Sequence, residues 1–262
     1  MKVGIVGCGF IGTELSKFID ENNDFKLIGL NDIDKSKVDI LIKNLNQKPK
    51  LMETDELIHK SELIIESAST EAVEKILKSK NLDKKHKKLL VMSTGGLIKD
   101  PNLLNKIKNC LILLPSGAIS GLDAIKSVVG KIKSLRLTTT KPIRGLESAP
   151  HITKNRINLK NLKNKKVIFE GNLKEAIIGF PKNINVAATL YLASKFDDMQ
   201  VKIIADPTAI YNTHEIEVIG DFGKIKTTTN NLPSENPRTS YLALLSAINI
   251  LKNMKNNIKI GN

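Results

Sequence analysis

The sequence predicts an α/β fold in which a doubly wound parallel sheet is followed by an inserted α+β domain with a mixed sheet. This prediction depends on three observations. A buried-strand pattern over residues 2–6 runs directly into the spacing G-x-G-x-x-G at Gly7, Gly9 and Gly12, which is how a Rossmann-type βαβ unit begins. The first half of the chain alternates strand-like and helix-like segments. The second half changes to a two-residue period, clearest over residues 214–218.

The first half contains short apolar segments that we expect to form the parallel strands. They cover residues 2–6, 26–30, 63–66, 89–92 and 110–114. The segments between them predict helices over residues 11–22, 35–44, 54–59, 70–80 and 101–108. This alternation is typical of a sheet that is covered by helices on both faces.

The second half predicts a mixed sheet with a helical face. Strands with the period of antiparallel pairs are expected over residues 135–140, 167–171, 201–205, 214–220 and 224–230. Helices are expected over residues 122–129 and 180–193, and a last amphipathic helix over residues 240–252 is expected to return to the first domain. We therefore predict a dinucleotide-binding domain of residues 1–116 plus 236–262, and a substrate domain of residues 117–235.

The glycine loop predicts a dinucleotide site. Gly7 allows the tight turn after the strand, Gly9 lets the backbone approach a pyrophosphate, and Gly12 allows close helix packing. Phe10 and Ile11 lie between these glycines, so we expect them to border the cofactor too. The helix that follows offers its N-terminal amides to phosphates.

A second strand ends at Asp32, and an acid at this distance from the loop can accept hydrogen bonds from the adenosine ribose. Asp32 favours NAD, although Lys35 and Lys37 leave NADP possible. The alternative is a purely structural turn with a solvated Asp32.

Small polar residues follow several predicted strands, at the edge where a doubly wound sheet binds its ligands. They occupy residues 67–70, 93–96 and 115–118. Ser67 is the one that we expect to line the cofactor site. Small residues are also what strand-to-helix turns ordinarily use, so a structural role is the alternative.

The composition argues against nucleic-acid and membrane partners. The net charge of the 262-residue chain is +14, but the excess is almost all lysine, aromatic residues make up 4% and tryptophan is absent. Base readout favours arginine, and single-strand binding favours aromatic platforms. No segment approaches the ~20 apolar residues of a membrane span, and the N-terminus lacks a signal-peptide pattern. We therefore expect a cytoplasmic protein.

The cysteines and histidines give no metal-ligand spacing, so no metal site is predicted. Cys8 and Cys110 lie in apolar segments and are expected to be buried thiols. His214 stands at a loop-to-strand transition among donors and acceptors, which makes it a candidate general acid or base. A hydrogen-bonded structural histidine is the alternative.

Longer motifs resemble those of the L-aspartate dehydrogenases over nearly the whole chain. They are the glycine loop, residues 114–123 (LPSGAISGLD), residues 180–188 (FPKNINVAA), and Asp206-Pro207 followed by residues 212–216 (NTHEI). Sugar and inositol dehydrogenases instead carry Glu-Lys-Pro after the fifth strand, whereas Thr140-Lys141-Pro142 comes a strand too late here.

The resemblance implies that Ala118 and Asn185 contact the nicotinamide cofactor and that His214 is catalytic, with Asn183 as the other possible register for Asn185. It further implies NAD(P)-dependent oxidation of L-aspartate to iminoaspartate, which hydrolyses to oxaloacetate and ammonia. A homodimer and a place in NAD biosynthesis are also implied.

Two other functions remain open on the residues alone. One is a non-catalytic NAD(P)-binding sensor, and the other is a dehydrogenase of a different amino or hydroxy acid. The substrate carboxylates need cationic or amide partners, for which Lys182, Arg144 and His151 are candidates that the sequence does not rank.

Overall fold

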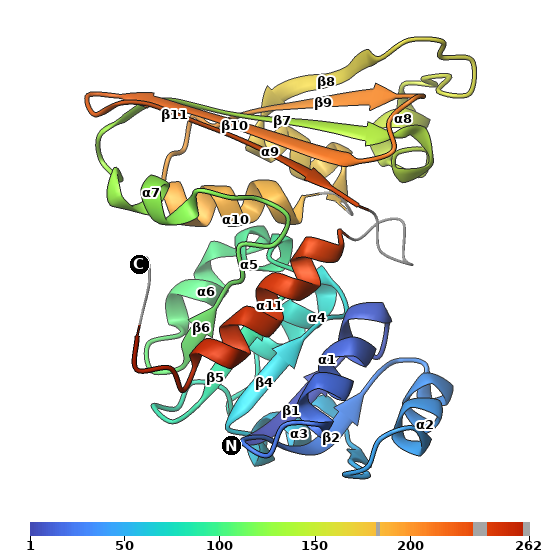
Figure 1. Ribbon diagram of the computed structural model, residues 1–262, viewed down its shortest axis with the longest axis vertical. Coiled ribbons are helices and arrows are strands. Elements are labelled where there is room, and N and C mark those ends of the chain that lie inside the picture. The colour runs from blue at the N-terminus through green and yellow to red at the C-terminus, as the bar shows by residue number, and fades with distance from the viewer. Residues whose placement is uncertain (182–183, 233–239, 259–262) are drawn as a thin grey trace. The chain divides into compact units, whose positions relative to one another are not determined.

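A computed structural model describes residues 1–181, 184–232 and 240–258 of the chain (Figure 1). The chain divides into two compact units. The first comprises Met1–Pro115 and Ala247–Lys252, and the second comprises Ser116–Ser246 and Asn253–Asn262.

The first unit contains a six-stranded sheet in the order β3-β2-β1-β4-β5-β6. Every neighbouring pair in it is parallel, and this order is that of a doubly wound Rossmann sheet, as the sequence predicts. The strands are β1 (Lys2–Val6), β2 (Lys26–Asn31), β3 (Lys50–Leu51), β4 (Leu63–Glu66), β5 (Lys88–Val91) and β6 (Leu111–Leu113).

Helices connect these strands in alternation. They are α1 (Phe10–Asp20), α2 (Lys35–Lys43), α3 (Thr54–Lys60), α4 (Thr70–Leu77), α5 (Gly95–Lys99) and α6 (Pro101–Lys106). The sequence did not predict β3 or α5. β3 is only two residues long, and α5 begins with two glycines, which are poor helix formers.

Residues from both faces of the central strands are buried. All four residues of β4 are inaccessible to solvent, and Val3 and Ile5 of β1 are fully buried too. Strands that are covered on both faces have near-continuous apolar sequences. Short runs of apolar residues, rather than an alternation of apolar and polar residues, therefore predict these strands.

The second unit contains a five-stranded sheet in the order β11-β10-β7-β9-β8. Its strands are β7 (Ile132–Pro142), β8 (Lys166–Asn172), β9 (Gln200–Asp206), β10 (Asn212–Gly220) and β11 (Gly223–Asn231). The sheet is mixed, as predicted: β7 pairs with β9 in parallel, and the other neighbouring pairs are antiparallel. A two-residue period reports which face is buried and does not report strand direction.

The second unit also contains α7 (Leu122–Ser127), a 3₁₀ turn at Ile143–Gly145, α8 (Pro150–Lys154), α9 (Leu173–Gly179) and α10 (Asn185–Ser194). The expected helix over residues 180–193 is wrong at its start, because Phe180 caps the C-terminus of α9. A capping box formed by Asn172 and Glu175 begins α9. The last helix, α11 (Tyr241–Asn253), has its residues 247–252 in the first unit.

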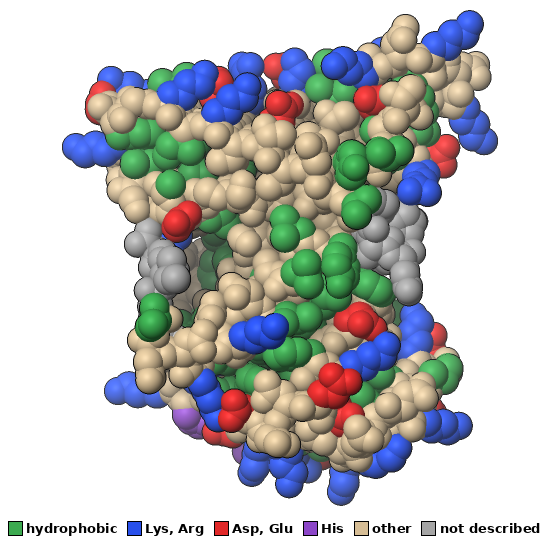
Figure 2. All heavy atoms as spheres, in the orientation of Figure 1, with side chains coloured by type: hydrophobic (Ala, Val, Ile, Leu, Met, Phe, Trp, Pro, Cys, Tyr) green, Lys and Arg blue, Asp and Glu red, His purple; other side chains and the backbone are tan. Residues whose placement is uncertain are grey.

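Among the described helices, none is long and apolar enough to cross a membrane. Basic side chains are scattered over the face seen in Figure 2 and are interspersed with acidic ones. On that face, within the described residues, they do not merge into one basic surface.

Candidate functional site

The three glycines of the first loop are required for three different reasons. Gly7 has φ +99°, a conformation that L side chains rarely adopt. A Cβ on Gly12 would lie 1.8 Å from the carbonyl oxygen of Gly7, so only glycine fits there. A Cβ on Gly9 would meet nothing within 4 Å. Gly9 is therefore the loop position at which a side chain would enter open space.

That open space belongs to a cavity of about 570 Å³ in the first unit. Gly7, Gly9, Asp32 and Ser67 line it, and they come from the carboxyl ends of β1, β2 and β4. Phe10 and Ile11 are the first residues of α1 and are not among the lining residues. The volume is in the range of small-molecule sites.

Asp32 is held in place by two backbone donors. Its Oδ2 accepts a hydrogen bond from the Cys8 amide at 2.6 Å, and its Oδ1 accepts one from the Asp34 amide at 2.9 Å. Each carboxylate oxygen has a second lone pair that remains suited to a ribose hydroxyl. Lys37 lines the same cavity, so a cation is near the acid.

Glu66 organises the turns beside this cavity, and sequence reasoning missed it. The side chain is fully buried and accepts hydrogen bonds from the amides of Ala68 at 2.8 Å, Ser69 at 2.9 Å and Ser93 at 2.9 Å. Burial raises the pKa of the Glu66 carboxyl, while these amides oppose the shift. The signal in the sequence was an acid at the end of an otherwise apolar strand.

The residues of this cavity fit a dinucleotide. Gly9 leaves room for a phosphate at the beginning of α1, where amides and the helix dipole favour anions. Asp32 supplies acceptors at the end of β2. These are the positions that phosphates and a ribose require in a Rossmann unit.

His214 lies on the buried face of the sheet in the second unit. Its side chain is 4% exposed, and its Nδ1 is 2.9 Å from the Oγ1 of Thr139 on the neighbouring strand β7. Burial, together with the charge of Lys141 as the smaller cause, lowers the pKa of His214 from 6.5 to about 3. The imidazole is therefore neutral near pH 7.

Ala118 lies beside this histidine although it is far from it in sequence. The carbonyl oxygen of Ala118 accepts hydrogen bonds from Thr229 Oγ1 at 2.8 Å and from Asn231 Nδ2 at 3.0 Å. Thr229 pairs with His214 across β10 and β11. Two of the residues predicted from the sequence are thus brought together in the second unit.

Other predicted residues lie elsewhere in the second unit. Asn185 is exposed at the first position of α10, and Asn183 and Lys182 lie outside the described residues. Arg144 belongs to the 3₁₀ turn after β7.

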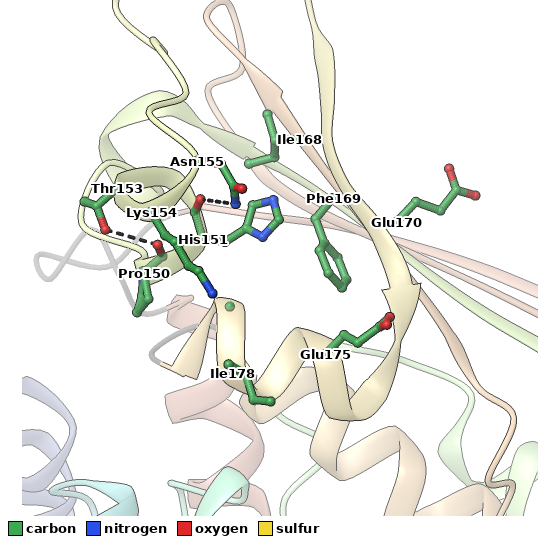
Figure 3. Close-up of a pocket in the computed structure, with 11 residues that line it drawn as sticks. Pro150, His151, Thr153, Lys154, Asn155, Ile168, Phe169, Glu170, Glu175 and Ile178 are labelled. Atoms are coloured by element: carbon green, nitrogen blue, oxygen red, sulfur yellow. Dashed lines mark hydrogen bonds between the residues drawn. The ribbon is translucent and has the colours of Figure 1, made fainter.

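His151 is packed among aromatic rings. Its ring stacks on Phe180 with centroids 5.2 Å apart and meets Phe169 edge-on at 5.4 Å. The two side chains lie next to each other in Figure 3. They line a cavity of about 890 Å³ together with Lys154. A packing role accounts for these contacts, and the predicted carboxylate contact stays a prediction.

Both cysteines are buried, as predicted. Burial raises the pKa of Cys8 to about 12 and that of Cys110 to about 11, so both remain thiols. No group of three or more His, Cys, Asp or Glu side chains in the described part of the chain could hold a metal ion.

Comparisons with known proteins match both halves of the chain. The family profile described as "Aspartate dehydrogenase, C-terminal" matches residues 123–254, and that described as "Homoserine dehydrogenase, NAD binding domain" matches residues 7–110. The L-aspartate dehydrogenase of Methanosarcina mazei is 44% identical over 100% of this chain and 99% of its own length. That of Methanococcus maripaludis is 42% identical over the same shares.

Solved structures agree with these matches. Aspartate dehydrogenase from Thermotoga maritima superposes with a TM-score of 0.75 and 27% identity, covering 100% of this chain and 99% of that one. The myo-inositol dehydrogenase of Lactobacillus casei, at 12% identity and a TM-score of 0.54 over 89% of this chain and 76% of its own, shares the fold.

Proposed function

Because this chain belongs to the L-aspartate dehydrogenase family, we propose that it oxidises L-aspartate to iminoaspartate with a nicotinamide cofactor. The imine then takes up water and gives oxaloacetate and ammonia. When bound, the nicotinamide supplies the hydride acceptor for the hydrogen on the substrate Cα. We further propose that residues 1–116 with 236–262 bind the cofactor and that residues 117–235 bind the substrate.

The observation that carries the mechanism is the neutral, buried imidazole of His214. A base must be unprotonated to remove the N–H proton as the imine forms or to activate the attacking water, and burial keeps His214 in that form. The Thr139 hydroxyl fixes the ring through Nδ1, which leaves Nε2 as the nitrogen for proton transfer. Ala118 and Asn185 are proposed to contact the cofactor, on the strength of the family resemblance.

NAD is the proposed cofactor, with NADP possible. Gly7, Gly9 and Gly12 are proposed to receive the pyrophosphate, with Phe10, Ile11 and Ser67 beside it. A 2′-phosphate would be repelled by Asp32, whereas Lys37 in the same cavity would attract it. The negative charge of Asp32 supports a preference for NAD, and the positive charge of Lys37 leaves the use of NADP possible.

We also propose a cytoplasmic homodimer that supplies iminoaspartate to NAD biosynthesis. This part of the proposal depends on the family resemblance alone. Light scattering of the purified protein tests the dimer, and rescue of an NAD-auxotrophic host by the expressed chain tests the pathway. A monomer or an absence of rescue would remove the corresponding assignment.

The proposed reaction is tested with a panel of amino and hydroxy acids and both cofactors, followed at the absorbance of reduced nicotinamide. L-Aspartate should give the highest kcat/KM. A faster hydroxy acid or other amino acid would replace the proposed substrate. Binding of NAD without turnover of any compound would favour a sensor.

His214→Ala tests the mechanism. The variant should bind NAD as the parent does and lose about 10²- to 10⁴-fold in kcat, as expected for a missing general acid or base. His86→Ala is the control, because this histidine is exposed and does not line the cavity of about 570 Å³, so the variant should keep near-parent turnover. An active His214→Ala protein would exclude the histidine from the mechanism.

A further inference from the structure

The buried face of the sheet in the second unit changes from apolar to polar at one end. Its apolar part includes Leu135 and Leu137 of β7 and Ile216 and Val218 of β10. Its polar end consists of residues on three neighbouring strands: Thr139, Lys141, Asn212, His214, Thr229 and Asn231. Apart from Thr229, each of them is less than a tenth exposed.

The strand register places these residues in two adjacent rows. Thr139, His214 and Thr229 form the first row, since His214 pairs with both of the others. Asn212 pairs with Asn231, and continuing the register of β7 and β10 by one residue puts Lys141 opposite Asn212. Residues in such neighbouring rows on one face are about 7–8 Å apart diagonally, within reach of a long side chain.

Lys141 brings a positive charge to this polar end. Its side chain is 7% exposed, and burial lowers its pKa to about 8, so it is largely protonated at neutral pH. Its charge also contributes to lowering the pKa of His214, as expected for two groups on adjacent rows of one face. A buried lysine is expensive to keep in a fold, and this favours a role that needs its charge.

Asn231 brings a hydrogen-bond acceptor with no partner. Its Nδ2 donates to the carbonyl oxygens of Ala118 at 3.0 Å and Asn212 at 3.2 Å, which fixes the orientation of the amide. Its Oδ1 is buried and has no hydrogen-bond partner among the described residues. A buried acceptor of this kind is costly unless a donor pairs with it, and a ligand with an N–H group can supply that donor.

We propose that Lys141 and Asn231 bind the amino-acid substrate, Lys141 through a carboxylate and Asn231 Oδ1 through the amino nitrogen. This inference rests on the proposed function and deepens it. A cation and a lone-pair acceptor on either side of a neutral imidazole complement the carboxylate and the amine of one small molecule. Ala118, which Asn231 holds by its carbonyl, lies against the same group of residues.

Lys141→Met is the first test. The side chain keeps its length and loses its charge, so the melting temperature should stay equal or rise, while KM for L-aspartate should increase about 10- to 100-fold. The matched control is Lys133→Met, on the same strand, where the lysine is exposed and paired with Asp221. KM should be unchanged there. A Lys141→Met protein with parent KM, or with KM raised only through lost stability, overturns the role of Lys141.

Ligand binding without turnover is the second test. Calorimetry in the presence of NAD compares L-aspartate with succinate, which has both carboxylates and no amine. Lys141→Met should weaken both, whereas Asn231→Ala should weaken aspartate at least 10-fold more than succinate in a protein that still melts cooperatively. Equal losses for the two acids overturn the role of Asn231.

These results separate the two levels of the proposal. A parent protein that binds aspartate without oxidising it refutes the proposed function and leaves Lys141 and Asn231 as binding residues. A parent protein that oxidises aspartate while Lys141→Met behaves like Lys133→Met refutes the inference alone. Binding of neither acid overturns both residue assignments.

Discussion

Replacing Gly9 by valine should separate cofactor binding from folding. Gly9 caps the N-terminus of α1 with φ −74° and ψ −168°, an extended conformation that any residue adopts. Its Cβ would meet no atom within 4 Å, so neither backbone strain nor a clash arises in the unliganded protein. The branched side chain would instead fill the space through which a pyrophosphate reaches the backbone.

The expected change in stability is small. Glycine is a better helix cap than valine by up to about 1 kcal/mol, whereas a side chain lowers the entropy of the unfolded chain by about 0.4–1 kcal/mol. These effects nearly cancel, so the melting temperature should move by no more than about 2–4 °C. Gly12→Ala provides the contrast, because its Cβ would lie 1.8 Å from the Gly7 carbonyl oxygen and force the backbone to shift.

The assay measures NAD affinity by calorimetry and folding by circular dichroism on the same preparations. Gly9→Val should remain folded and show no measurable NAD binding, whereas Gly12→Ala should lose stability as well, by about 1–3 kcal/mol. A folded Gly9→Val protein with parent affinity would refute the assignment of the loop to the pyrophosphate. Unfolding of Gly9→Val would refute the claim that its Cβ enters open space.

Three further predictions concern single carboxyl or imidazole groups. Asp32→Ala should weaken NAD more than NADP in steady-state kinetics, and equal losses would mean that its contacts to Cys8 and Asp34 are its whole role. Glu66→Gln places an amide donor against a backbone donor, so calorimetric melting should show a loss of about 1–3 kcal/mol, and a parent melting temperature would contradict this. The pKa of His214 falls from 6.5 to about 3 on folding, so the unfolded chain binds a proton at a higher pH than the folded protein does. As the pH falls through this interval, the wild type should therefore lose stability relative to His214→Ala. If the difference in unfolding free energy between the two proteins does not vary with pH, the pKa of His214 is not lowered by folding.

Five of the six parallel strands of the first unit could be predicted, because each is a short apolar run. A short apolar run followed by a glycine turn specifies a buried parallel strand, and the boundaries of β1 and β4 match the predicted ranges. The two-residue strand β3 has too little sequence to leave a pattern. Phe180 follows the end of α9 and does not begin α10, and the sequence does not distinguish the two because an apolar residue suits either position.

The site residues that could be predicted belong to short sequence motifs. The proposed substrate-binding residues could not be predicted, because they come together only through the pairing of strands. Gly7, Gly9 and Asp32 are recognisable from spacing alone. Lys141 and Asn231 are separated by most of the second unit, and only the pairing of β7, β10 and β11 puts them on one face. A single sequence contains no direct record of that pairing.

The discontinuous first unit has a consequence for the order of folding. Ala247 and Leu251 of α11 are fully buried or nearly so, and the ammonium of Lys252 lies 5.9 Å from the centre of the Phe18 ring. During synthesis the residues up to Pro115 emerge long before this helix does. The first unit therefore cannot complete its fold, and part of its apolar surface stays exposed, until the intervening residues have been synthesised. A chain truncated after Pro115 would keep that exposed surface permanently and should be prone to aggregation.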